Sequence, residues 1–519
     1  MTYLFVLALI LSSLIKIIAI WGNNFALTPD QGRDLLDVRQ MVVTHIPRLV
    51  GPTTSINGVL LGPFYYYFIT VPFVLFKGDP AAIVIWQIVW FQIAVLFIWY
   101  VLKKKSLSLA NLTGILLLLS PVGFYTGRYF WNANAMPIFT ILFFGCLFDT
   151  VWHKNNLRLI TLGLIAGFSL QIEAAFGLLF IPFALLICFF KKFSFIDLLK
   201  ITLAFAVTLL PQILFEFRHQ FLMTKTLIAG LSGKSDVLGE KLTFLSKLSE
   251  RQELFFKALR ESNHINFEML GPIFLVVFLL AIYYTFSSKN SKTEKDMISI
   301  SFHFLVFAGL FYLCFPQHVK GWYVLSLSIS VIFLLSGVLS NLYHQSRLGP
   351  FFVWLFIIYS FYHTLLAHTD YLARYALKPS SDPSNMANEL RAIDWVYSQA
   401  DGQPFKVYSY LPSIYDYPYQ YLFWWYGTKE FGYQPADIAY LPHQPEYIKD
   451  NDLFWTKRNT SATNMPIFLI IQADNDHQDR LFAWRGNFAS LCEVSATKIV
   501  SSLSVVKLVS CPAKTNRAK

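Results

Sequence analysis

The chain has 519 residues, of which 55% are hydrophobic, 17% aromatic and only 14% charged, and its mean hydropathy is +0.48. This composition is typical of a membrane protein and excludes an ordinary water-soluble globular protein. The formal net charge of +11 comes from lysines and arginines in short clusters between apolar runs. That pattern indicates membrane topology and gives no support for a nucleic-acid partner.

The apolar runs predict an α-helical polytopic membrane protein with about 11 spans. The first run lacks a basic leader and a small-residue cleavage site, which favours a retained span over a cleaved signal peptide. The runs lie near 2–21, 80–102, 107–125, 136–152, 157–175, 177–190, 195–216, 268–286, 297–315, 322–341 and 349–368.

The segment Leu61–Phe76 is ambiguous, because it is apolar enough to be a span or to lie in the membrane plane. If it does not cross, every basic cluster falls on one side of the membrane, as the positive-inside rule requires. We therefore expect an in-plane or partly inserted helix, a cytoplasmic N-terminus and a multi-pass protein of the cell membrane. The clusters are Lys103–Lys105, Lys154 with Arg158, Lys191 with Lys192, Lys289 with Lys292 and Lys295, and Arg347.

The first outer loop, 22–79, opens with a strong helix-start signal. Thr28 can cap a helix, Pro29 suits its first position, and Gln31 completes a capping box. Within this helix Asp30, Arg33, Asp34 and Asp37 share one face, while Leu35, Leu36, Val38 and Val42 lie largely off it. We expect an amphipathic helix at the membrane surface, and a solvated helix with internal Asp–Arg pairs fits the spacing equally well.

Five outer segments carry ionisable residues at span ends, where charge is costly and therefore suggests function. A single such residue would be read as an interfacial anchor, whereas five segments on one face indicate a shared, water-filled cleft. Aromatic residues at Tyr65–Tyr67, Tyr129–Trp131 and Trp322–Tyr323 would form its walls. The ionisable residues are Asp30, Arg128, Glu173, Glu216, Arg218, His219, His318 and Lys320.

Such a cleft suits a sugar carried on a polyprenyl phosphate. Aromatic side chains pack against sugar rings and isoprenoid chains, and Arg, Lys and His bind phosphate. The phosphate is already a good leaving group, so transfer needs one carboxylate to accept the proton of the acceptor hydroxyl. Fixed cations then stabilise the departing phosphate.

Two motifs resemble the C-type integral-membrane glycosyltransferases, which include the protein O-mannosyltransferases and the aminoarabinose transferases. They are Thr28-Pro29-Asp30-Gln31 and Leu61-Gly62-Pro63-Phe64-Tyr65-Tyr66-Tyr67. Residues 127–137 (GRYFWNANAMP) are similar to the arginine-bearing second outer loop of that family. Residues 318–329 (HVKGWYVLSLSI) are similar to its late segment near the donor phosphate. The resemblance covers roughly the first 340 residues and predicts the C-type glycosyltransferase fold.

The resemblance implies that Asp30 is the catalytic base. Asp34 is the alternative or an orienting acid, since members often carry Asp-Glu where this chain has Asp30-Gln31. The donor phosphate would contact Arg128, Arg218, His219, His318 and Lys320. Acceptor-binding or structural roles fall to Glu173, Tyr65, Tyr66, Trp131 and Tyr323.

Glu173 has three open roles: it binds the acceptor, pairs with Arg128 or caps its span. Asn132 and Asn134 stand where the family often has an acid, so a divalent cation stays possible but no metal ligand is nominated. The sequence has no Walker motif, dinucleotide glycine signature or zinc motif. A soluble nucleotide-sugar donor is therefore not supported.

The stretch between the seventh and eighth runs contains a segment, 241–262, whose leucines approximate helical spacing. It predicts an amphipathic surface helix. Such a helix either shapes an entrance for lipid or acceptor, or covers the cleft without further function.

Composition changes at residue 369, which predicts a transmembrane domain over 1–368 and a small extracytoplasmic α/β domain over 369–519. We expect a helix near 386–399 and strands near 405–410, 465–472, 489–497 and 503–511. If the last two strands pair around Ser501 and Ser502, Cys492 and Cys511 stand directly opposite each other and can form a disulfide. That bond requires an oxidising outer compartment.

The sequence thus predicts an inverting membrane glycosyltransferase, transferring a hexosyl or pentosyl group. The donor would be a polyprenyl-phosphate-linked sugar and the acceptor a lipid, glycan or protein on the outer face. The alternative is a transporter or flippase of lipid-linked glycans, which predicts internal repeats and interrupted helices; no clear repeat is visible. An envelope scaffold is the third possibility, but it would not need charges at several span ends.

Overall fold

The computed structural model describes residues 1–232, 242–263, 267–286, 291–315, 318–444, 453–454 and 465–511. The chain divides into two compact units. The first, which we call the membrane unit, comprises Met1–Ile18, Arg48–Ile69 and Val84–Leu372. The second, the sheet unit, comprises Ala19–Pro47, Thr70–Ile83 and Ala373–Lys519.

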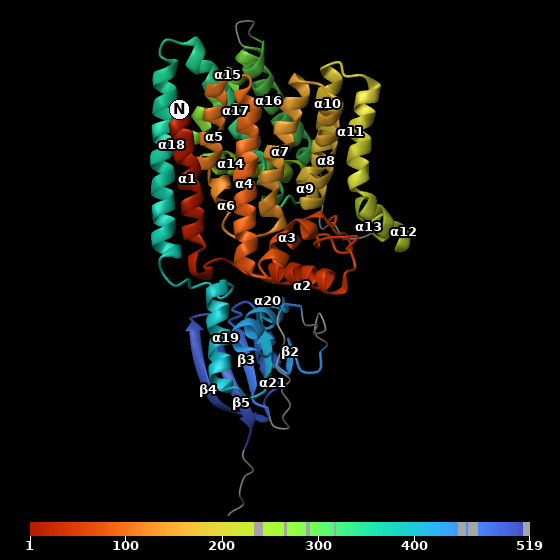
Figure 1. The fold of residues 1–519 in the computed structure, drawn as a ribbon, viewed down its shortest axis with the longest axis vertical. Coiled ribbons are helices and arrows are strands. Elements are labelled where there is room, and N and C mark those ends of the chain that lie inside the picture. Colours follow the sequence, from red (N-terminus) through yellow and green to blue (C-terminus); the bar gives the residue numbers. More distant parts are fainter. Residues whose placement is uncertain are drawn as a thin grey trace, which may run out of the picture. The chain divides into compact units, whose positions relative to one another are not determined.

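Long apolar helices form most of the membrane unit (Figure 1). Among the described residues, six helices are long and apolar enough to cross a membrane. A seventh is added if α11 (Phe195–Thr208) and α12 (Leu210–Arg218), bent by 54° at their break, form one span. The six are α1 (Thr2–Ala19), α4 (Pro80–Lys103), α7 (Asn132–Trp152), α16 (Lys292–Cys314), α17 (Leu327–Gln345, with the preceding turn) and α18 (Gly349–Tyr371).

Several predicted spans are shorter or broken helices. Ser120 ends α5 (Leu107–Leu119) and caps α6 (Pro121–Tyr125) by accepting from the N–H of Gly123. In the same way, Glu173 separates α8 (Asn156–Ile172) from α9 (Ala174–Gly177) and α10 (Phe180–Phe190). Polar residues inside apolar runs therefore mark the breaks.

The ambiguous segment Leu61–Phe76 forms α3 (Phe64–Leu75), which has 12 residues. A helix of that length is about 18 Å long and is too short for a hydrocarbon core of about 30 Å. This length supports the prediction that the segment does not span the membrane. The remaining helices of the membrane unit are α13 (Leu222–Leu231), α14 (Phe244–Ser262) and α15 (Phe267–Phe286).

Small residues allow close helix packing in this unit. A Cβ atom built on Gly163 of α8 would lie 2.3 Å from the carbonyl oxygen of Ile201 in α11. One built on Gly167 would lie 2.0 Å from Oγ1 of Thr208. Membrane helices associate through such close approach of their backbones, because burial from water does not drive them together.

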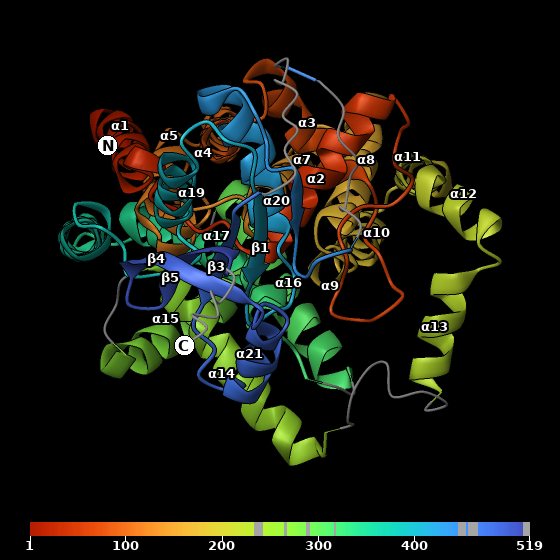
Figure 2. The ribbon, with the colours of Figure 1, turned by 90° about the horizontal axis from the view of Figure 1, so that it is seen from below.

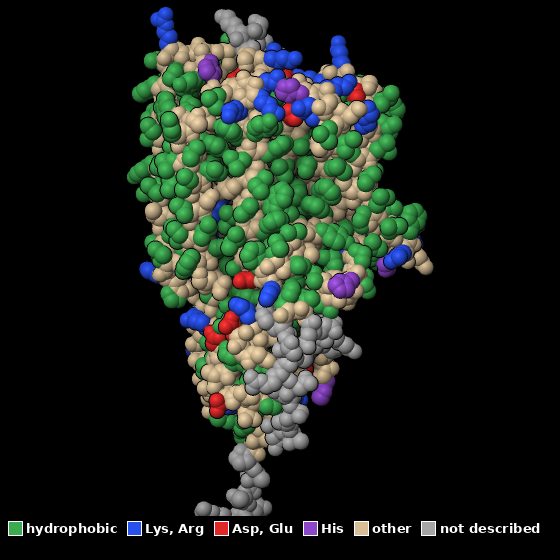
Figure 3. All heavy atoms as spheres, in the orientation of Figure 1, with side chains coloured by type: hydrophobic (Ala, Val, Ile, Leu, Met, Phe, Trp, Pro, Cys, Tyr) green, Lys and Arg blue, Asp and Glu red, His purple; other side chains and the backbone are tan. Residues whose placement is uncertain are grey.

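The basic clusters gather at one end of the membrane unit. Lys154 pairs with Asp197 at 2.5 Å, Lys191 pairs with Asp296, and the Ser108 hydroxyl lies 2.7 Å from the His344 ring. These contacts join the connections after α4, α7, α10 and α17. Figure 3 shows Lys, Arg and His side chains concentrated at that end. The grouping on which the positive-inside argument depends is present, although Lys289 lies outside the described residues.

A five-stranded mixed sheet forms the core of the sheet unit, in the order β2-β1-β3-β5-β4. β1 (Lys406–Tyr410) is parallel to β2 (Asp437–Ala439) and to β3 (Ile467–Gln472). β5 (Leu503–Ser510) is antiparallel to both β3 and β4 (Leu491–Val500). α19 (Met386–Ala400) packs against β4 and β5, and α21 (Gln478–Gly486) adds Trp484 to the core. The predicted α/β fold of the C-terminal region is confirmed.

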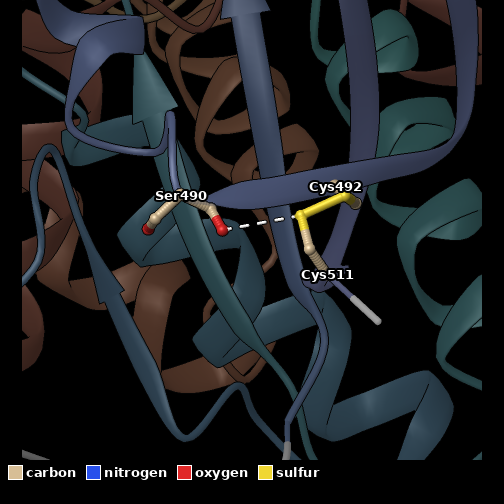
Figure 4. The surroundings of a disulfide bond; sticks show 3 residues. All are labelled: Ser490, Cys492 and Cys511. Atoms are coloured by element: carbon tan, nitrogen blue, oxygen red, sulfur yellow. Dashed lines mark hydrogen bonds between the residues drawn. A yellow bond between two sulfur atoms is a disulfide. The ribbon is translucent and has the colours of Figure 1, made fainter. Parts of the chain in front are cut away.

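A disulfide joins Cys492 and Cys511, with their Cα atoms 4.9 Å apart (Figure 4). The expectation that the two residues stand directly opposite each other was wrong, because Cys492 pairs with Val509. Two irregularities in β4, at Glu493/Ser495 and Lys498/Val500, shift the register. Each inserts an extra residue into β4, as a β-bulge does. The bond therefore runs diagonally to Cys511, just beyond the end of β5.

Candidate active site

The helix start predicted in the segment 22–79 is correct. α2 (Pro29–Thr44) begins with Thr28 as its cap and Pro29 at its first position. The backbone N–H of Thr28 donates to the Gln31 side-chain oxygen at 2.8 Å, as a capping box requires. This local chemistry fixes where Asp30 lies: it is on the first turn of the helix.

The prediction that α2 is an amphipathic surface helix holds only for its first turn, where Asp30 is exposed, because the charged side chains further along the helix are buried. Asp34, Asp37 and Arg39 are only 1%, 6% and 3% exposed. Apolar residues elsewhere on α2, among them Leu35 and Val38, are also buried. Buried charges need partners. Ion pairs to Arg33 and a cation–π contact of Arg39 supply some of them.

Arg33 connects an exposed acid to a buried one. Its Nη1 lies 2.9 Å from Asp30, whose side chain is 53% exposed. Its Nη2 and Nε lie 2.9 and 3.1 Å from Asp34, which is buried. Asp30 is therefore the carboxylate on this helix that a substrate can reach, and Arg33 holds it in place.

Burial raises the pKa of Asp34 to about 7, although Arg33 opposes the rise. The rise in pKa prevails because burial is its largest cause, and the negative charges of Asp37 and Asp30 add to the effect of burial. Asp34 is thus suited to orient Arg33 and is not placed to meet a substrate.

At the end of the membrane unit that carries residues 171–175, four segments meet in a group that we call the aromatic cluster. It comprises Ser55, Trp131, Tyr312, Trp322 and Tyr323. The Trp131 and Trp322 rings lie 5.8 Å apart, edge to face. The Tyr312 hydroxyl donates to the Ala175 carbonyl at 3.0 Å, and the Ser55 and Tyr323 hydroxyls are hydrogen-bonded.

Glu173 is buried beside this cluster, with 7% of its surface exposed. Its carboxylate accepts from the N–H of Ala175 at 3.3 Å and caps α9. Of the three roles considered for Glu173, capping is the one this contact fulfils. No ion pair joins it to Arg128 among the described residues.

Three of the predicted phosphate ligands have distinct surroundings. The Arg128 guanidinium lies 4.5 Å from the Tyr371 ring, and its Nε has no hydrogen-bond partner within the described part of the chain. His318 is exposed, with Nδ1 2.8 Å from Glu250. Lys320 is exposed, 6.0 Å from the Trp322 ring. Lys320 therefore contacts the aromatic cluster through Trp322, whereas His318 is close to the cluster only in sequence.

Arg218 and His219 are placed differently. Both are exposed at the end of α12, where the His219 ring stacks on Phe215 at 4.0 Å. Figure 2 shows α12 and α13 at the periphery of the membrane unit, where α12 continues from α11. None of the contacts in the described ranges joins these two side chains to the aromatic cluster.

Tyr65 and Tyr66 on α3 are fully buried, with 0% and 1% of their surfaces exposed. Both are therefore part of the packed core of the structure. Among the residues nominated for acceptor binding, Trp131 and Tyr323 keep the accessible positions in the aromatic cluster, since both are only partly buried.

Sequence reasoning assigned no site role to several further residues. Lys16 in α1 is 1% exposed, and its ammonium lies 3.9 Å from the Phe91 ring with no hydrogen-bond partner among the described residues. Glu250 accepts from the N–H of Val319 at 2.7 Å, and Arg251 donates to the Tyr312 carbonyl. A lysine within an apolar run was the one available signal. Nothing in the sequence singled out Tyr312.

The amphipathic helix predicted over 241–262 is α14 (Phe244–Ser262); residues 233–241 lie outside the described ranges. Its buried side contributes to an apolar cavity of about 310 Å³. A cavity beside α14 favours the hypothesis that this helix shapes an entrance for lipid or acceptor over the hypothesis that it only covers the cleft. Its walls come from four helices and include Phe255 and Leu259 of α14, Leu275 and Phe278 of α15, Leu305 of α16 and Val331 of α17.

Within the described residues, no group of three or more His, Cys, Asp or Glu side chains is arranged to hold a metal ion. The nominated residues therefore place an exposed carboxylate, Asp30, in the sheet unit and cations and aromatic rings in the membrane unit. The membrane unit also contains the apolar cavity.

No protein-family model and no curated protein matches the chain. Solved structures of ArnT from Cupriavidus metallidurans do match. The undecaprenyl-phosphate-bound structure aligns with a TM-score of 0.53 and the apo structure with 0.55. In both cases the identity is 10% and the alignment covers 97% of each chain. The chain therefore has the ArnT fold, and the predicted C-type glycosyltransferase fold is confirmed.

Proposed function

We propose that this chain, whose fold is that of ArnT, is a membrane glycosyltransferase with a polyprenyl-phosphate-linked sugar donor. The observation that carries the proposal is an alignment over 97% of both chains to a protein solved with undecaprenyl phosphate. The acceptor is a lipid, glycan or protein. The end of the membrane unit opposite the basic clusters faces the outside, in keeping with the positive-inside rule.

In the proposed reaction, the acceptor hydroxyl oxygen attacks C1 of the donor sugar. The bond from C1 to the phosphate oxygen breaks, and the polyprenyl phosphate leaves with the bonding electrons. Asp30 takes the hydroxyl proton as general base. Attack from the face opposite the phosphate inverts the anomeric carbon. The exposure of Asp30 and its bond to Arg33 support this role, and Asp34 orients Arg33 from behind.

The membrane unit supplies the groups that bind the donor. Arg128, His318 and Lys320 are assigned to the phosphate, with Arg218 and His219 as outlying candidates. Fixed cations stabilise charge that develops on a leaving phosphate. The edge-to-face pair of Trp131 and Trp322 offers a surface for a sugar ring. Glu173 and Tyr323 support that surface.

The apolar cavity behind α14 is assigned to the polyprenyl chain of the donor. Its lining is almost wholly apolar, and Lys257 of α14 lies near Gly321, in the segment that carries Lys320. An anionic lipid matches this combination of an apolar cavity and nearby cations.

Replacing Leu259 with tryptophan is expected to fill this cavity and raise KM about tenfold for a long-chain donor. Leu259 is 2% exposed and lies on the cavity wall. A donor with one or two isoprene units should be used as before, because it does not reach the cavity. Steady-state kinetics with both donors test this.

The matched control is Leu348→Trp, at a position that is 64% exposed between α17 and α18. It should change neither KM. Equal losses with long and short donors in Leu259→Trp would instead indicate general damage and would remove the cavity from chain binding.

The proposed function is tested with purified protein in lipid nanodiscs or liposomes, given radiolabelled sugars on polyprenyl phosphate. The expected result is release of polyprenyl phosphate and appearance of label in an acceptor fraction. Movement of the intact labelled donor across the liposome membrane, without loss of its sugar, would contradict the proposal and indicate a flippase.

A further inference from the structure

We infer that the C-terminal part of the chain positions α2, so that residues 384–424 act as positioning elements for the proposed base Asp30. This inference rests on the proposed function. It concerns contacts inside the sheet unit, to which Ala19–Pro47 and Ala373–Lys519 both belong.

The first attachment is at the entry to α2. Ala26 and Asn385 form an antiparallel β-bridge. The N–H of Leu27 donates to the Ser384 carbonyl at 2.8 Å, and the N–H of Met386 donates to the Phe25 carbonyl at 2.8 Å. These two backbone hydrogen bonds therefore fix Phe25, Ala26 and Leu27, the three residues that precede the helix cap Thr28.

The second attachment is on the buried side of α2, at Gly32. A Cβ atom built there would lie 2.5 Å from the backbone nitrogen of Pro418 and 2.7 Å from the carbonyl carbon of Tyr417. Tyr417 and Pro418 are the first two residues of α20 (Tyr417–Leu422). Backbone atoms cannot rotate away as a side chain can, so only glycine permits this approach.

The third attachment lies two turns further along α2. The Arg39 guanidinium is 4.4 Å from the Trp424 ring, and Arg39 is 3% exposed. A cation–π contact is stronger when it is desolvated, as this one is, than at an exposed site. The segment after α20 thus holds the far part of α2 as well.

Asp30 lies between the first and second attachments, three residues after Leu27 and two before Gly32. A shift of α2 relative to α20 must therefore move the Asp30 carboxylate. Because a displacement of about 1 Å can cost about a hundredfold in rate, contacts far from the chemistry control catalysis here.

The test is Gly32→Ala. The added methyl group cannot fit 2.5 Å from the Pro418 nitrogen, so α2 must move away from α20. We expect kcat to fall about a hundredfold, with KM for the donor within twofold, since the donor-binding groups are assigned to the membrane unit. The control is Gly486→Ala, where a built Cβ meets nothing within 4 Å.

A second pair of variants covers the case in which Gly32→Ala does not fold. Trp424→Phe keeps an aromatic face for Arg39, whereas Trp424→Leu does not. The phenylalanine variant should retain most of kcat and the leucine variant should lose about tenfold. A merely space-filling role for Trp424 would lower the activity and the melting temperature of both variants together.

Amide hydrogen exchange provides a readout that does not depend on transfer. Residues 30–37 should exchange faster in Gly32→Ala than in wild type, and at the wild-type rate in Gly486→Ala. Wild-type exchange and kcat in Gly32→Ala would overturn the inference. If wild-type protein transfers no sugar, the proposed function is overturned. The inference that residues 384–424 position α2 still stands in that case, provided that Gly32→Ala exchanges faster than wild type over residues 30–37.

Discussion

Asp30→Asn is expected to lower kcat for sugar transfer about a thousandfold, within the range that general-base catalysis contributes. The amide has the shape of the carboxylate but cannot accept the acceptor's proton. Donor binding should be nearly unchanged, because the phosphate contacts are assigned to other residues. Single-turnover transfer and a donor-binding assay, measured on the same preparation, separate the two quantities.

The matched control is Asp401→Asn, at an exposed position just after α19 where the backbone is left-handed. Asparagine tolerates that conformation, so this variant should have wild-type kinetics. Wild-type turnover in Asp30→Asn would remove Asp30 from the role of base. Loss of turnover together with loss of donor binding would assign Asp30 to the donor instead.

The features of the fold that depend on local chemistry were predictable from the sequence. The capping box at Thr28 and Gln31 gave the start of α2, because both partners lie within one helical turn. Apolar length gave the long helices. The break at Ser120 was missed, since a single polar residue changes the hydropathy of a long run very little. The break near Glu173 was anticipated, because the runs 157–175 and 177–190 were predicted as separate spans.

The features that depend on distant residues were not predictable. The burial of α2 results from Tyr417, Pro418 and Trp424, which lie almost four hundred residues further along the chain. A charged helix face looks the same in sequence whether water or a protein core covers it. The register at Cys492 was missed for a related reason, because bulges in β4 leave no clear pattern in the sequence.

The candidate site shows the same division. The residue types of the site were recognisable, because a carboxylate, cations and aromatic rings at span ends are uncommon in a membrane protein. The surroundings of these site residues could not be predicted from the sequence. No pattern in the sequence favoured Lys320 over Arg218, but Lys320 lies near Trp322 and Arg218 lies on the peripheral α12.

Asp34→Asn is expected to remove a large pH dependence from the stability of the sheet unit. Burial raises the pKa of Asp34 from 3.8 to about 7 in the folded protein. The folded state therefore favours the protonated form, so the contribution to stability is complete below about pH 4 and is lost as pH rises to 7. Such a change in pKa corresponds to about 4 kcal/mol.

Thermal unfolding in detergent should show a higher midpoint for Asp34→Asn than for wild type at pH 8 and similar midpoints at pH 4.5. Asp401→Asn is again the control, with wild-type behaviour at both pH values. A midpoint for Asp34→Asn below that of wild type at pH 8 would mean that the ion pair with Arg33 outweighs the cost of burial, and that Asp34 is ionised throughout this range.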